Sequence, residues 1–78
     1  MQDPRIEAAL QELRTLILTR YPTAAFLTFP GDDPAGMYLR ATVEVEDTDE
    51  VVDVIIDRLL AMQVDEGLPV YVIPVRAA

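Results

Sequence analysis

Carboxylates supply most of the groups in this sequence that could do chemistry. The chain carries fourteen Asp and Glu residues against six Lys and Arg, which gives a formal charge of −8. The densest acidic group surrounds the end of a predicted strand and the start of a predicted helix: Glu44, Glu46, Asp47, Asp49, Glu50, Asp53 and Asp57. Hard cations such as Ca²⁺ and Mg²⁺ bind carboxylate oxygens, and so do basic proteins. Because the group contains no calcium-loop glycine, we interpret it as a solvated surface.

A second pair of carboxylates, Asp32 and Asp33, lies in the turn-rich run PGDDPAG. Paired loop carboxylates can serve acid–base catalysis or bind a metal ion. Asp, Gly and Pro are also the residues that turns use, and the run lacks the Lys-Ser/Thr of a phosphate-binding loop. We therefore interpret the pair as part of a hairpin loop over residues 30–36. A carboxylate- or divalent-cation-dependent enzyme remains the alternative.

The residue types that are missing restrict the chemistry further. The sequence contains no His, Cys, Lys, Ser, Asn or Trp. The common nucleophiles and the side chain that titrates near neutral pH are therefore absent, as are the usual ligands of zinc, haem and iron–sulfur clusters. We expect a protein that is not an enzyme and that holds no cofactor and no metal ion.

One cation lies where an aromatic side chain and a hydroxyl converge. Arg40 alternates with Tyr38, Thr42 and Glu44 along a predicted strand, so these side chains share one face. An anionic small ligand could use this group, but we favour an Arg40–Glu44 pair or a dimer contact. The candidate interface residues come from this face and from the last strand: Tyr38, Arg40, Thr42, Tyr71, Ile73 and Val75.

Two helices must position these groups. Asp3-Pro4 is an N-cap followed by a proline at the first helical position, and apolar residues then recur at helical spacing. This pattern predicts a helix over residues 4–20. Thr48 or Asp47, followed by acidic first-turn residues, can cap a second helix, for which Gly67 is the expected left-handed C-terminal residue.

Three strands complete the predicted fold. Residues 23–29 are apolar on both alternations, residues 37–46 alternate strictly, and residues 68–75 contain Pro74. Because proline lacks the N–H that a central strand needs, we place the last strand at an edge and the apolar first strand in the middle. The sequence thus predicts one α+β domain over residues 1–78. It is a two-layer αββαβ sandwich with strand order 2-1-3, two helices on one face and a parallel third strand.

Two resemblances accompany this fold. The αββαβ order resembles type II KH domains in outline, but the Gly-x-x-Gly loop and basic groove of those domains are absent, so RNA binding is not implied. The stretch VVDVIIDRLLAMQVDEGLPVYVIP, residues 51–74, resembles the C-terminal part of a group of short uncharacterised bacterial proteins. That group brings no activity. The exclusive use of Arg as the basic residue also favours a GC-rich bacterial source.

Charge and patterning also indicate location and partners. The acidic balance and scattered Arg residues argue against binding to nucleic acid or to anionic membranes, and they favour any second partner being basic. The N-terminal residues lack the basic and apolar stretches of a secretory signal, so we expect a cytoplasmic protein.

The fold itself predicts self-association. Two helices cover one side of a three-stranded sheet, and the two strands that are apolar on both alternations leave an apolar band on the other side. A small core without disulfides also gains stability from a second copy. We therefore predict a homodimeric protein-interaction module, associated through the uncovered sheet face or the edge of the last strand. An antitoxin-like or immunity-like protein that binds a basic partner is a further alternative.

Overall fold

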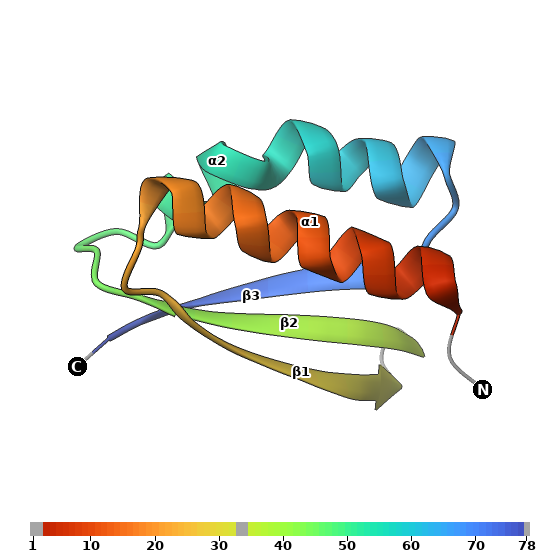
Figure 1. Ribbon diagram of the computed structural model, residues 1–78, viewed down its shortest axis with the longest axis horizontal. Coiled ribbons are helices and arrows are strands. Elements are labelled where there is room, and N and C mark those ends of the chain that lie inside the picture. The colour runs from red at the N-terminus through yellow and green to blue at the C-terminus, as the bar shows by residue number, and fades with distance from the viewer. Residues whose placement is uncertain (1–2, 33–34, 78) are drawn as a thin grey trace.

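The computed structural model describes residues 3–32 and 35–77. Its elements, in chain order, are α1 (Pro4–Arg20), β1 (Ala25–Asp32), β2 (Ala35–Val43), α2 (Asp49–Leu60), the π-helical turn η1 (Ala61–Asp65) and β3 (Val70–Arg76). The two helices lie beside each other on one side of the three-stranded sheet (Figure 1). The described residues form no layer on the other side of the sheet.

The ends of the helices follow from local chemistry. At the start of α1, the Arg5 N–H donates to Asp3 Oδ1 at 2.9 Å, and Pro4 occupies a position that needs no donor. The helix spans residues 4–20, as predicted. At the start of α2, the cap bond comes from Asp47, whose Oδ1 accepts the Asp49 N–H at 2.9 Å, while Thr48 makes no side-chain cap bond. Gly67 adopts the expected left-handed conformation, with φ 64°.

The strand order differs from the prediction. The sheet runs β1-β2-β3, so β2 is central and β1 is an edge strand, and the predicted order 2-1-3 is wrong. β1 pairs antiparallel with β2, and β3 is parallel to β2, as expected. Proline explains the order, because β1 contains Pro30 and β3 contains Pro74, whereas β2 contains none. The one strand that can donate along its whole length occupies the middle.

Both prolines occupy outward positions on their edge strands. The Met37 N–H donates to the Pro69 carbonyl and the Ala77 N–H to the Val43 carbonyl, both at 2.9 Å. Odd-numbered residues of β3 therefore point their backbone groups at β2, and Pro74 faces away from it. Because odd-numbered residues of β2 bond to β3, even-numbered ones bond to β1. Pro30, paired with Met37, consequently faces outward as well.

The hydrophobic core lies between the helices and one face of the sheet. Its largest fully buried side chains come from both helices, η1 and two strands: Leu10, Leu13, Ile17, Leu39, Val43, Val51, Ile55, Met62 and Val70. β2 ends sooner than predicted, at Val43, where the Val45 N–H turns back to the Val43 carbonyl. No helix in the described part of the chain is long and apolar enough to span a membrane.

Candidate functional site

The sheet surface opposite the helices, called here the outer face, is built from every second residue of the three strands. Leu39, Ala41 and Val43 of β2 are at most 1% exposed beneath the helices, so the residues between them point to the other side. Register aligns the outer face in three cross-strand rows: Phe29–Tyr38–Tyr71, Leu27–Arg40–Ile73 and Ala25–Thr42–Val75. All six candidate interface residues lie on the outer face.

An aromatic row crosses all three strands. The Phe29 and Tyr38 rings stack with centroids 5.6 Å apart and an interplanar angle of 13°. The Tyr38 and Tyr71 rings lie 5.0 Å apart at 32°. Offset contacts of this kind each contribute about 0.5–1.5 kcal/mol beyond the area they bury. The row therefore holds its rings in fixed positions on the surface.

Two glycines make room for these rings. A Cβ at Gly31 would lie 2.3 Å from Tyr38 Cε1, and one at Gly36 would lie 2.8 Å from Tyr71 Cε2 and 2.4 Å from the Pro69 carbonyl oxygen. The sequence predicts both glycines in a hairpin loop, but in the structure they pair with each other between β1 and β2. The predicted loop over residues 30–36 is thus largely strand. Aromatic rings placed over strand glycines stabilise a sheet surface that would otherwise expose backbone.

The middle row combines exposed apolar side chains with one charge. Leu27 is 50% exposed and Ile73 is 38% exposed. The sequence does not single out Leu27 or Phe29, because its pattern predicts β1 at the centre of the sheet and does not determine which alternation of β1 faces outward. The signal that could have found them is Pro30, which marks β1 as an edge strand and fixes its orientation.

Arg40 lies between Leu27 and Ile73 in this row and is exposed. Within residues 3–32 and 35–77, its guanidinium makes no hydrogen bond and no ion pair, so the predicted Arg40–Glu44 pair is not formed. An unpaired cation surrounded by aromatic and aliphatic side chains is suited to contact a second molecule.

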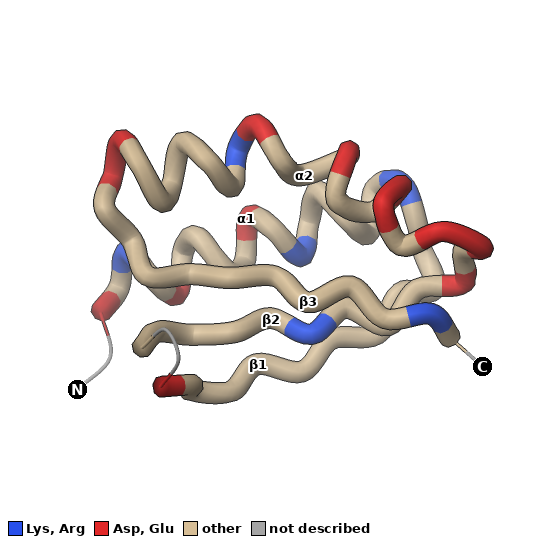
Figure 2. Tube along the Cα trace, turned by 180° about the vertical axis from the view of Figure 1, so that it is seen from behind, with Lys and Arg blue, Asp and Glu red and all other residues tan. Residues whose placement is uncertain are grey.

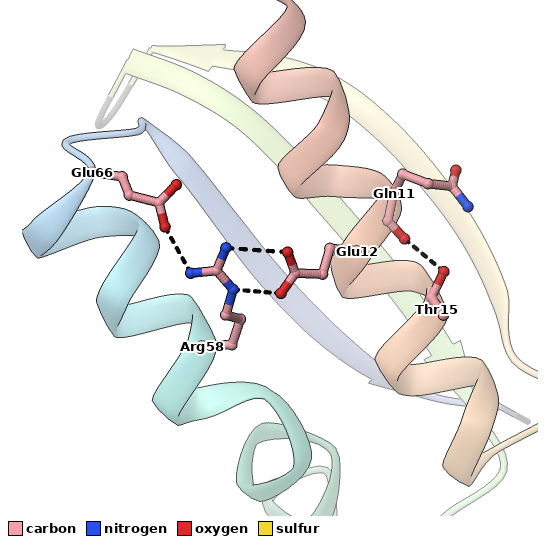
Figure 3. Close-up of polar contacts among 5 residues, drawn as sticks. All are labelled: Gln11, Glu12, Thr15, Arg58 and Glu66. Atoms are coloured by element: carbon pink, nitrogen blue, oxygen red, sulfur yellow. Dashed lines mark hydrogen bonds and ion pairs between the residues drawn. The ribbon is translucent and has the colours of Figure 1, made fainter.

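On the helix side of the sheet, Arg58 is paired with carboxylates, unlike Arg40 (Figure 3). Arg58 of α2 donates from Nε and Nη2 to the two carboxylate oxygens of Glu12 in α1, and from Nη1 to Glu66 Oε2 at 2.7 Å. The hydrogen bonds to Glu12, followed by the one to Glu66, raise the pKa of Arg58 above its ordinary value. Sequence reasoning missed this contact because Glu12 and Arg58 lie 46 residues apart. It joins the two helices.

The acidic residues gather at the end of the molecule where the chain passes from β2 into α2 (Figure 2). Among the described residues, no three acidic side chains come close enough to hold a metal ion together. Asp32 is the exposed last residue of β1, and Asp33 lies outside the described residues. The acidic end therefore shows no assembled cation site in the described part of the chain, and a basic partner there stays a prediction.

Comparison with known proteins adds no relative. No protein-family model, no curated protein and no solved structure matches the chain. The resemblance of residues 51–74 to short bacterial proteins therefore stays a prediction, and function must be argued from the outer face itself.

Proposed function

We propose that the protein is a non-enzymatic interaction module that forms a homodimer through its outer face. The observation that carries this proposal is the continuity of the three rows across the whole sheet, with no layer of the described chain over them. Tyr, Phe and Arg are among the side chains enriched in protein contacts, because all three bury a large surface, and the polar atoms of Tyr and Arg can bond to water when no partner is bound. A plain solvated face would carry charges at these positions.

Hydrogen bonding at the edge of β3 favours the face over the edge as the contact. The outward backbone groups of Val70 are already used, because its N–H donates to the Leu68 carbonyl and its carbonyl accepts Gln63 Nε2 at 2.8 Å. Pro74 has no N–H to offer. A strand added beside β3 could pair with the Val72 N–H, but the outward positions on either side of it, Val70 and Pro74, offer no free N–H. β1 is interrupted by its own proline.

Size favours a second copy as the occupant of the outer face. A chain of 78 residues buries a small share of its surface on folding, and it has no disulfide. A copy packed on the outer face would bury Leu27, Ile73 and the aromatic row without any further segment of the chain. Apolar surface removed from water stabilises the fold by roughly 25 cal/mol per Å².

Two leucines of equal exposure provide a matched test. Leu27 on the outer face is 50% exposed, and Leu60 on α2, on the opposite side of the molecule, is 48% exposed. Replacing either with Glu makes the same chemical change and the same change in net charge. We expect light scattering at high micromolar concentration to find a dimer for the unmodified protein and for Leu60→Glu, and a monomer for Leu27→Glu. A monomeric unmodified protein would overturn the proposal.

A further inference from the structure

We infer that the two outer faces pack with their strands running in opposite directions, so that Arg40 of each copy lies on the aromatic row of the other. This inference rests on the proposed dimer and specifies its geometry. It starts from Arg40, an unpaired guanidinium in the middle row, which lies one row away from Phe29, Tyr38 and Tyr71.

Symmetry limits how two identical faces can meet. A closed pair of copies is related by a two-fold axis, and for two sheets packed face to face this axis lies within the interface. If the axis runs parallel to the strands and passes over β2, each row of one copy faces the same row of the other copy. Arg40 then faces the Arg40 of the other copy, and the three rows contain no carboxylate to separate the two charges. Like charges removed from water repel strongly.

The other simple axis removes this conflict. If it crosses the strands between the aromatic row and the middle row, the two rows exchange across the interface. Arg40 of each copy then lies over Tyr38 of the other, where a guanidinium is attracted to the face of the ring. The contact forms twice by symmetry, and it joins two of the residue types that are enriched among those dominating binding energy.

The tyrosine ring is held ready for this contact. Tyr38 is stacked on Phe29, contacts Tyr71 and lies over Gly31. A ring fixed before association loses little freedom when the partner arrives, which strengthens binding. In the same arrangement each strand lies over the same strand of the other copy, so Leu27 faces Phe29 of the other chain and stays far from Ile73.

Disulfide trapping distinguishes the two axes, because the chain contains no natural cysteine. We expect a mixture of ¹⁵N-labelled L27C with unlabelled F29C to form a mixed disulfide under mild oxidation, because these two positions face each other across the interface. A mixture of ¹⁵N-labelled L27C with unlabelled I73C should yield no mixed disulfide, as judged by mass spectrometry. Failure of L27C to link to F29C while the unmodified protein is dimeric, or a disulfide joining L27C to I73C, would overturn the inference and leave the proposed dimer standing.

A second pair of variants tests the role of the charge. Arg40→Met should raise the dimer dissociation constant about tenfold, because it removes the cation from both aromatic contacts. Arg76→Met is the control, since Arg76 is also exposed and makes no ion pair among the described residues, and it should leave the constant unchanged. A tighter Arg40→Met dimer would show that the two charges face each other and would overturn the inference.

Discussion

The two faces of β2 differ only by alternation, yet they carry opposite kinds of side chain. Leu39, Ala41 and Val43 face the helices and are sealed from water, whereas Tyr38 and Arg40 face outward. The inner side chains have no polar atoms and suit a permanent core. The outer side chains combine a large apolar body with a polar tip, so they tolerate water and can also bury against a partner. This difference indicates that the outer face is built for a reversible contact.

The largest expected effect is the difference in unfolding free energy lost by truncating a core leucine and an outer-face leucine. Leu39→Ala removes a fully buried side chain and should lower the free energy of unfolding by about 3 kcal/mol. Leu27→Ala on the outer face should cost less than about 1 kcal/mol in the monomer, because half of that side chain is already exposed. Urea denaturation of both variants at a concentration below the dimer dissociation constant measures the two values. Equal losses would contradict the distinction between the faces.

The two outer-face glycines should differ in the same way. Gly36→Ala places a methyl group against the Pro69 carbonyl, which belongs to the backbone at the start of β3, and should destabilise the monomer by roughly 2 kcal/mol. Gly31→Ala meets only the Tyr38 ring, which can move aside. We expect it to destabilise the monomer less than Gly36→Ala does and to weaken the dimer, because the aromatic row is displaced. Thermal unfolding and light scattering measure the two effects, and a Gly31→Ala protein that dimerises normally would contradict the role of the row.

Hydrogen exchange sharpens the comparison along the sheet. The Leu39 and Ala41 amides lie in the central strand and bond to β3, whereas Thr28 and Val72 have outward-facing amides on the two edges. The central amides should exchange roughly a hundredfold more slowly than these two. Exchange monitored by NMR would refute the observed strand order if Thr28 were the slowest of the four.

The smallest effect is expected on the helix side. Arg58→Met removes the contact of α2 with Glu12 and Glu66, which is partly exposed and screened by water. Monomer stability should fall slightly, and the loss should shrink as salt is added. The dimer dissociation constant should not change, since this contact lies on the side of the sheet away from the outer face. Urea denaturation at two salt concentrations measures the change in stability, and sedimentation velocity measures the dissociation constant.

Local signals predicted the elements well. The helix over residues 4–20 follows from the Asp3 cap and from Pro4, which act within a few residues. The strand order depended instead on pairing between distant segments. Strict alternation in β2 shows that one of its faces is covered, and this holds for a central strand and an edge strand alike in a two-layer fold. Pro30 indicates that β1 is an edge strand, but this signal is lost when Pro30 is predicted to lie in a loop.

The candidate site was predicted in part. Alternation alone grouped Tyr38, Arg40 and Thr42, and the structure adds the rows that join them to β1 and β3. The stacking of Phe29 on Tyr38 follows from the register between two strands, which no short-range pattern determines. The register between β1 and β2 also places the Tyr38 ring over Gly31.

The central claim is that the outer face is the surface on which two copies meet. An NMR dilution series of the unmodified protein, from millimolar to low micromolar concentration, tests it most directly. The account predicts a particle of twice the 8.7 kDa chain mass at the high end, with amide shifts that change on dilution at Leu27, Arg40 and Ile73. Spectra that do not depend on concentration, from a particle with the mass of one chain, would contradict it, as would changes confined to Val72 at the β3 edge or to Leu60 on α2.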